Sequence, residues 1–194
     1  MSNPVSETKP EVRVQDTHLK LAQIMTPTDA NVLGKVFGGS ILSMIDLTAS
    51  ATAQKFAGRV CVTASFERVD FHTPIDVGAL VTMRGHVSYA GRTSVEVTID
   101  VTATDLPTGR DTHTNTARVI MVAVDNGRPV PVPTLICETR EERIAFVSGR
   151  LRRELRAERI AQFDGLVAQI QAMDDATLTE LQTCEGRLMD RLQA

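Results

Sequence analysis

The chain has 194 residues, of which 42% are hydrophobic and 23% charged, and its net charge is −3. These values are ordinary for a globular protein with one domain and an appendage. The small net charge excludes a general attraction to nucleic acid or anionic lipid. We expect no membrane insertion, because no apolar run could span a bilayer. We expect a cytoplasmic location, because the N-terminus lacks a signal-peptide pattern.

Three cysteines, Cys61, Cys137 and Cys184, are far apart in the sequence. They form no CxxC pair and no metal-ligand spacing. We therefore expect reduced thiols in packed positions, no disulfide framework and no catalytic metal.

The first half of the chain leads into one long helix. Residues 1–12 are predicted to be a flexible polar tail, and residues 13–136 a single domain. Residues 14–25 are expected to contain a first strand, and residues 26–34 a loop. The next stretch, 38–54, has helix length and is apolar almost all round, which is typical of a buried helix.

After this helix the hydrophobic pattern changes to period two. Strands are predicted over 60–71, 80–89, 94–104 and 112–124, with glycine- or proline-containing turns between them. Along 94–104 four apolar residues share one face and four polar residues the other: Val95, Val97, Ile99 and Val101 against Glu96, Thr98, Asp100 and Thr102. This alternation indicates a half-buried antiparallel strand. The predicted fold class is α+β, with a curved antiparallel sheet wrapped around the helix.

Residues 137–194 are predicted to form a helical C-terminal extension. Arginines and glutamates are interleaved between 138 and 159, leucines recur at helical spacing, and Asp174-Asp175 marks a break and a new helix start. Mixed charges are typical of a solvated helix face. The alternatives are contact with a partner or a second protomer, or with the phosphates of a nucleotide. Nucleic acid is disfavoured by the glutamates and the few aromatic residues.

Asp46 is the one charged residue between Gly38 and Gln54. An ionised carboxylate on a buried helix is unfavourable unless it is hydrogen-bonded or used in chemistry. Ser43 and Ser50 lie three residues before it and four after it, so the three side chains share one polar stripe. Asp46 is therefore a candidate catalytic acid. The alternative is a structural carboxylate that caps a neighbouring loop.

The segment 28–46, TDANVLGKVFGGSILSMID, resembles the signature of hotdog-fold acyl-CoA thioesterases, in particular the YciA-type and cytosolic acyl-CoA hydrolases. Shorter matching pieces follow in order at 62–65, 69–71, 91–94 and 122–125. The resemblance covers residues 15–135 and leaves the C-terminal extension outside. It implies the hotdog fold, a sheet around a long helix, in agreement with the pattern of elements.

The resemblance also implies hydrolysis of acyl-CoA to a carboxylic acid and CoA. Asp46 would act as general base toward water, or as nucleophile through a mixed anhydride, and the sequence leaves both open. Asn31 of the partner protomer would orient the water or the thioester carbonyl; the alternative for Asn31 is a turn former. The backbone N–H groups of Gly38, Gly39 and Ser40 would stabilise the oxyanion at the helix N-terminus.

Two further segments are predicted to bind the CoA portion. In the 91–94 turn, Arg92 offers a fork for phosphate, although the glycine by itself indicates no more than a hairpin. Thr63 and Ser65 are expected along the pantetheine channel. The complete predicted CoA-binding set is Gly91, Arg92, Thr93, Ser94, Thr63 and Ser65. CoA is here part of the substrate, and no cofactor is expected.

The resemblance places the active site between two protomers. It therefore implies a homodimer as the minimum active unit, and commonly a hexamer built as a trimer of dimers. The competing functions are a thioester dehydratase and a non-catalytic acyl-CoA sensor. A hotdog dehydratase typically uses a histidine with an acid, and His72, His86 and His113 lie away from the 28–46 motif. A sensor would need an effector module, for which the extension is a candidate.

Overall fold

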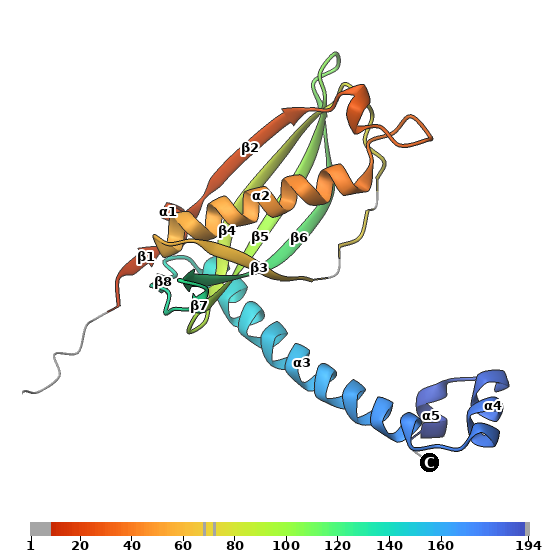
Figure 1. The fold of residues 1–194 in the computed structure, drawn as a ribbon. Coiled ribbons are helices and arrows are strands. Elements are labelled where there is room, and N and C mark those ends of the chain that lie inside the picture. The colour runs from red at the N-terminus through yellow and green to blue at the C-terminus, as the bar shows by residue number, and fades with distance from the viewer. Residues whose placement is uncertain (1–8, 68, 72, 193–194) are drawn as a thin grey trace, which may run out of the picture. The chain divides into compact units, whose positions relative to one another are not determined.

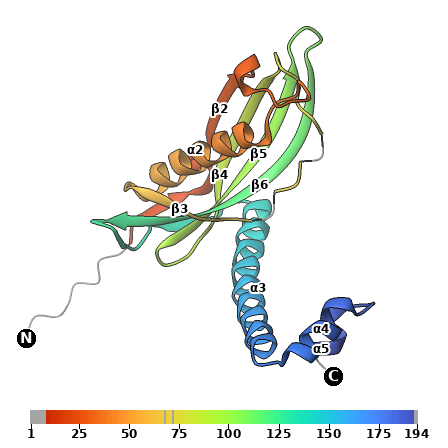
Figure 2. The same ribbon diagram turned by 45° about the vertical axis from the view of Figure 1, so that its right-hand side comes forward.

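The computed structural model describes residues 9–67, 69–71 and 73–192. In this part of the chain the main sheet has the spatial order β2-β4-β5-β6-β3, with β7 beside β6. Its strands are β2 Leu19–Ile24, β3 Cys61–Phe66, β4 Leu80–Ala90, β5 Ser94–Asp105, β6 Arg110–Asp125 and β7 Arg128–Pro129. All these pairings are antiparallel. The sheet curls around helix α2, Gly38–Ala57, which lies across its concave face (Figures 1 and 2).

The remaining elements flank this sheet or follow it. They are β1 Glu11–Arg13, α1 Val14–Thr17, the 3-10 turn η1 Pro27–Asp29, β8 Thr134–Ile136, α3 Arg140–Gln171, α4 Asp175–Thr183 and α5 Leu188–Leu192. β1 and β8 pair in parallel. The chain divides into two compact units, residues 1–149 and residues 150–194. None of the helices in the described residues is both long and apolar enough to cross a membrane.

Helix α2 confirms the predicted long helix but is not buried all round. One face packs into the sheet with eight buried side chains: Ile41, Met44, Ile45, Thr48, Ala49, Thr52, Ala53 and Phe56. On the other side Ser43 and Leu47 are exposed. The prediction of an all-round buried helix is wrong for a single chain, because the sheet covers only one side. The helix ends at Gly58, whose φ of 63° and N–H bond to the Gln54 carbonyl form a left-handed C-cap.

The strand predictions hold for β4, β5 and β6, with small differences at the ends. The segment 60–71 forms a shorter strand, because β3 ends at Phe66. The expected first strand, 14–25, is divided into α1 and β2. Thr17 accounts for this division, because its hydroxyl donates to the Val14 carbonyl at 2.7 Å and accepts the Val87 N–H at 3.0 Å.

Strand β5 is buried on both faces over part of its length. Val97, Ile99 and Val101 face α2 as predicted, but Glu96 and Thr98 are also buried, at 1% and 8% exposure. The prediction of a half-buried strand is therefore wrong at these two residues. The cause is the first part of α3, which covers the outer face of the sheet.

Close contacts fix this first part of α3 on the sheet. A Cβ at Gly149 would lie 2.6 Å from the Tyr89 Cβ and 3.1 Å from the Glu96 carboxylate. The Phe146 ring meets the Tyr89 ring edge-on at 5.1 Å. Glu96 accepts a hydrogen bond from the Ser88 hydroxyl at 2.8 Å, which satisfies part of the buried carboxylate.

Candidate active site

Asp46 lies on the side of α2 that the sheet leaves partly open. Its Oδ1 accepts a hydrogen bond from the Thr63 hydroxyl of β3 at 2.5 Å. A hydroxyl–carboxylate bond of this length is a strong, charge-assisted one. Ser50, predicted to share a polar stripe with Asp46, instead accepts a hydrogen bond from Gln54 at 2.9 Å. The partner that holds the carboxylate therefore comes from a neighbouring strand and not from the helix.

Thr63 is brought to Asp46 at an irregular point of β3. In the pairing with β6, Thr63 lies opposite Met121 while Ser65 lies opposite Ile120, so the register shifts between them. Such a bulge re-aims side chains locally and often adjoins a functional site. Thr63 is a predicted CoA-binding residue, and its contact with Asp46 was not predicted. The alternating Val-Thr-Ala-Ser pattern indicated a strand but not a bulge.

The start of α2 offers backbone donors. Phe37 is the N-cap residue and has no side-chain cap. The N–H of Ser40 donates to the Phe37 carbonyl at 3.0 Å, so it is engaged within the turn. The N–H groups of Gly38 and Gly39 are the donors that this helix start presents. A Cβ at Gly39 would lie 2.2 Å from the exposed Phe37 ring, which would then have to move.

Asn31 forms the turn that precedes α2. Its side-chain Oδ1 accepts the N–H groups of Leu33 at 2.9 Å and Lys35 at 3.2 Å. The turn-forming role is therefore present, and the Nδ2 group is the end of the amide that can donate to a ligand. Asp46 lies eight residues after Gly38, or about 12 Å along the helix axis. Asn31 and Asp46 thus have different hydrogen-bond partners, Asn31 in its own turn and Asp46 on Thr63.

The 91–94 turn joins β4 to β5 and is well held by the backbone. Gly91 N–H donates to the Ser94 carbonyl at 2.8 Å, and the Arg92 carbonyl accepts the Val132 N–H at 3.0 Å. The Arg92 side chain is exposed. Val62 of β3, Val122 of β6 and Ser94 of β5 form one cross-strand row. The turn therefore begins two strand spacings, about 10 Å, from the strand that carries Thr63.

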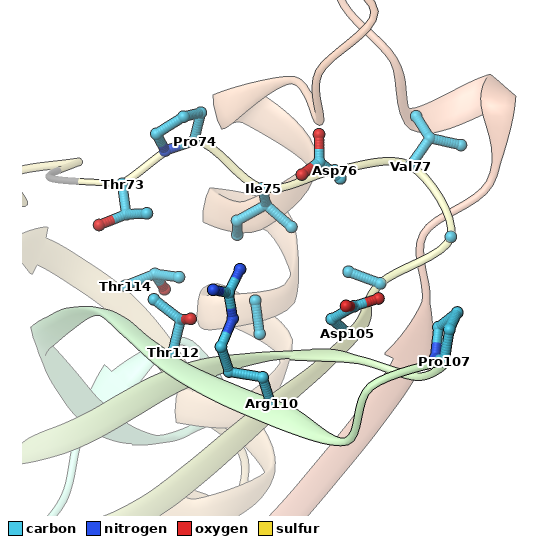
Figure 3. Close-up of a pocket in the computed structure, with 13 residues that line it drawn as sticks. Thr73, Pro74, Ile75, Asp76, Val77, Asp105, Pro107, Arg110, Thr112 and Thr114 are labelled. Atoms are coloured by element: carbon cyan, nitrogen blue, oxygen red, sulfur yellow. The ribbon is translucent and has the colours of Figure 1, made fainter.

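A surface pocket of about 460 Å³ lies between residues 73–79 and the β5–β6 turn (Figure 3). Asp76, Asp105 and Arg110 contribute its charged groups, and Figure 3 shows the Arg110 guanidinium directed toward Ile75. The residues that line it include none of the predicted site residues. This pocket is therefore separate from Asp46.

Apolar side chains are exposed on α2 and on the neighbouring edge strand β3. On α2 Leu47 is 59% exposed, and on β3, the edge strand of the sheet, Val62 is 47% exposed. Phe37 and Phe71 are also exposed near the helix start. Apolar surface next to an open strand edge is typical of a region that another protein surface covers.

His18, His86 and His113 have partners other than Asp46. His86 stacks on His18 with ring centroids 5.3 Å apart, and His113 hydrogen-bonds to Thr116 at 3.0 Å. His72 lies outside the described residues. Within 9–67, 69–71 and 73–192, no group of three or more His, Cys, Asp and Glu side chains is arranged to hold a metal ion.

Comparison with known proteins gives a consistent result. Residues 33–109 match the sequence model of the thioesterase superfamily. A Bacillus subtilis protein named uncharacterized acyl-CoA thioester hydrolase YkhA is 40% identical over 117 residues, which are 60% of this chain and 68% of that protein. A ligand-free hexameric acyl-CoA thioesterase superposes with a TM-score of 0.75 and 38% identity. This match covers 78% of this chain and 98% of that one.

An acyl-CoA hydrolase from Staphylococcus aureus, solved with butyryl-CoA, CoA and CoA disulfide, has a TM-score of 0.74 and 29% identity. The match covers 84% of this chain and 99% of that one. Further structures of that enzyme carry alanine in place of an asparagine, an aspartate or a threonine. The sequence intervals between these three positions equal the intervals between Asn31, Asp46 and Thr63. With this fold and these similarities, the chain belongs to the thioesterase superfamily, among the hotdog-fold acyl-CoA hydrolases.

Proposed function

We propose that this protein is an acyl-CoA thioesterase that hydrolyses acyl-CoA to a carboxylic acid and CoA. The observation that carries this proposal is the Asp46 carboxylate held by the Thr63 hydroxyl at 2.5 Å on the open side of α2. It occurs in a chain whose relatives are named acyl-CoA hydrolases and thioesterases. One of them has been solved with CoA ligands.

Asp46 provides the reacting carboxylate in this proposal. Thr63 engages Oδ1 and orients the group, and Oδ2 remains to face the substrate. As general base, Asp46 takes a proton from water while the water oxygen attacks the thioester carbon. As nucleophile, it attacks the carbon itself, and water then hydrolyses the mixed anhydride. In both routes the C–S bond breaks and the CoA thiolate leaves and takes up a proton.

The partner protomer completes the site. Within one chain, the Gly38 donor at the start of α2 lies about 12 Å along the helix axis from Asp46, and Asn31 lies in the turn before the helix. A second protomer that covers the open side of α2 would bring its own Asn31 and helix N-terminus to this carboxylate. The Gly38 and Gly39 N–H groups then stabilise the oxyanion, and the Asn31 amide orients the carbonyl or the water.

Assembly follows from the same surface. β3 is the edge strand of the sheet, and apolar residues lie beside it. We propose a homodimer formed through this edge as the minimum active unit. A trimer of dimers is the proposed final state, since a solved relative is hexameric.

For the CoA portion, we propose that Arg92 pairs with a phosphate and that Gly91, Thr93, Ser94 and Ser65 line the path toward β3. Arg92 is exposed, and its turn is rigidly held, so its guanidinium can reach a ligand without rearrangement of the backbone. We expect a cytoplasmic location, in which the three free thiols stay reduced.

The test is a thiol-release assay with a panel of acyl-CoA chain lengths. Asp46→Asn should lower kcat/KM by about 10²- to 10⁴-fold, as expected for loss of a catalytic acid–base group. Asp111→Asn is the matched control, because Asp111 also accepts a threonine hydroxyl, from Thr104 at 2.6 Å, but lies away from α2. Acyl-CoA binding without turnover by the wild type on every chain length would contradict the proposal and indicate a binding protein.

The route is tested by single turnover in ¹⁸O-labelled water. A general-base route places the label in the released acid alone. With enzyme in excess, a nucleophilic route in which water attacks the Asp46 carbonyl of the anhydride places ¹⁸O in the Asp46 carboxylate and leaves the first released acid unlabelled.

A further inference from the structure

The C-terminal extension, residues 150–192, contains helices but no core. Among these described residues no side chain is buried. Leu151, Leu155, Ile160 and Phe163 on α3 are all more than half exposed. In Figures 1 and 2 the extension is drawn in blue, with α4 and α5 at the C-terminal end of α3.

Helices of this kind depend on packing. Fixing a residue in a helix loses conformational entropy, and most helical stability in proteins comes from a buried apolar face. A 43-residue helical segment without one buried side chain has no such face within the extension itself. A surface outside the extension is therefore needed to cover Leu151, Leu155 and Phe163.

The charges of the extension are divided into two complementary segments. The basic segment, 150–159, has five arginines and two glutamates, a net charge of +3. The acidic segment, 174–191, has five acidic residues and two arginines, a net charge of −3. Arg152, Arg156 and Arg159 follow the helical spacing of one face. Partial burial of Arg156 lowers the pKa of its guanidinium, and the nearby positive charge of Arg159 lowers it further.

The two segments of one chain are too far apart to pair with each other. The middle of the basic segment lies sixteen residues, or about 24 Å of helix, before the end of α3 at Gln171. α4 has nine residues and reaches back only about 14 Å if it folds along α3. The Arg191–Glu180 ion pair at 3.7 Å keeps α5 beside α4, which holds the acidic segment at that end.

We propose that the extension pairs two copies of this chain, with the basic segment of each copy lying on the acidic segment of the other. This reciprocal arrangement is an isologous, two-fold contact, so the pairing of a basic with an acidic segment occurs twice in each dimer. It also encloses the apolar residues of α3. The contact does not depend on the thioesterase reaction.

The test uses two full-length charge-reversal variants. The first carries Arg152→Glu, Arg156→Glu and Arg159→Glu; the second carries Asp175→Lys, Glu185→Lys and Asp190→Lys. In either variant alone, the reciprocal contact brings like charges together. When the two are co-expressed, the acidic 150–159 segment of one meets the basic 174–191 segment of the other, and complementarity returns.

The readout is chymotrypsin cleavage after Leu151, Leu155 and Phe163, which these variants leave unchanged. The wild type should be cleaved slowly, each variant alone at least about tenfold faster, and the co-expressed pair again slowly, because cleavage follows the open population. Survival of the fragment up to residue 149 reports that the domain is folded. A Lys20→Glu and Asp111→Lys variant is the matched control and should behave as the wild type.

Recovery on co-expression requires contact between different chains, which separates this proposal from packing within one chain. Equal cleavage of the wild type and of each single variant would overturn it. Fast cleavage in the co-expressed pair would also overturn it and assign the surface to a different partner. Fast cleavage of the wild type would show that the extension has no stable partner copy.

Discussion

The proposed activity depends on a single hydrogen bond, from the Thr63 hydroxyl to the Asp46 carboxylate. It joins the middle of α2 to an irregular strand, and it fixes one carboxylate oxygen at 2.5 Å. A residue that acts through another is a positioning residue, so its loss should affect the reaction step more than substrate binding.

Thr63→Val removes the hydroxyl while keeping the β-branched shape. We expect kcat to fall about ten- to a hundredfold, since a hydrogen bond to a charged group is worth about 1.5–3 kcal/mol. KM should change little, because the acyl and CoA contacts remain. Thr104→Val, which removes the hydroxyl from Asp111, is the control. A large rise in KM with unchanged kcat would instead assign Thr63 to CoA binding.

The Cys61 thiol should not react with alkylating reagents in the folded protein. Burial raises the pKa of its thiol to about 11, from an ordinary value of 9.0. Only the thiolate reacts, so at pH 9 about one per cent of the folded population is reactive. Iodoacetamide should modify Cys61 only after unfolding in urea, whereas the partly exposed Cys184 reacts in the native state. Peptide mass spectrometry measures the two rates, and equal native rates would contradict the burial of Cys61.

The raised pKa also has a consequence for stability. The Cys61 thiol ionises at a lower pH in the unfolded chain than in the folded protein. Its contribution to the free energy of unfolding is therefore complete below pH 9 and is lost as the pH rises from 9 to about 11. A Cys61→Ala variant should not show this loss. Urea unfolding at pH 8 and pH 10.5 compares the two proteins.

At the level of elements, the pattern of the sequence predicted most of the fold. The change from helical to period-two spacing located α2 and the strands β4, β5 and β6. The break at Asp174 is confirmed, because its side chain accepts the Thr177 N–H at 2.8 Å as an N-cap. Each of these features depends on residues close together in the sequence, which is why pattern alone could find them.

The misassigned residues depend on contacts that are distant in the sequence. Glu96 and Thr98 alternate as outward-facing residues, and only the arrival of α3 some fifty residues later buries them. Thr63 reaches Asp46 through a register shift that no alternation pattern encodes. Ser43 shares the stripe of Asp46 but stays exposed, because the sheet covers only the opposite side of α2.

Gly85 sets the distance between α2 and β4. A Cβ there would lie 2.7 Å from the Thr52 hydroxyl and 3.1 Å from the Thr48 methyl group. Gly85→Ala should therefore lower the free energy of unfolding by about 1–3 kcal/mol, as overpacking does in well-packed cores. The measurement is the urea midpoint at constant m-value.

Two further variants make this prediction specific. Adding Thr52→Ala should recover part of the lost stability, because it removes the group that the new methyl meets. Gly165→Ala is the control, since a Cβ at this helical position has no atom within 4 Å. If Gly85→Ala is as stable as the wild type, the helix and the sheet are not in close contact at this point.

At the scale of the whole molecule, the sequence predicts candidate site residues but not how two chains would bring them together. Asn31 and Asp46 stand at the intervals found in the staphylococcal enzyme. One chain nevertheless keeps them apart, with Asn31 in its own turn and Asp46 on Thr63. In the proposed homodimer the Asn31 and Asp46 that meet belong to different chains, so a local sequence pattern cannot predict their contact.

Complementation between inactive variants tests the shared site directly. Asp46→Asn and Asn31→Ala should each abolish most of the turnover when expressed alone. In a mixed dimer, the Asp46 of the Asn31→Ala chain meets the Asn31 of the Asp46→Asn chain, which restores one of two sites. With random pairing, half of the dimers are mixed, so co-expression should recover about a quarter of the wild-type activity. As a control, Asp46→Asn co-expressed with a tagged copy of itself should remain inactive. Because a site built within one chain could never be restored in this way, activity that stays at the level of the single variants would assign Asn31 and Asp46 to the same protomer.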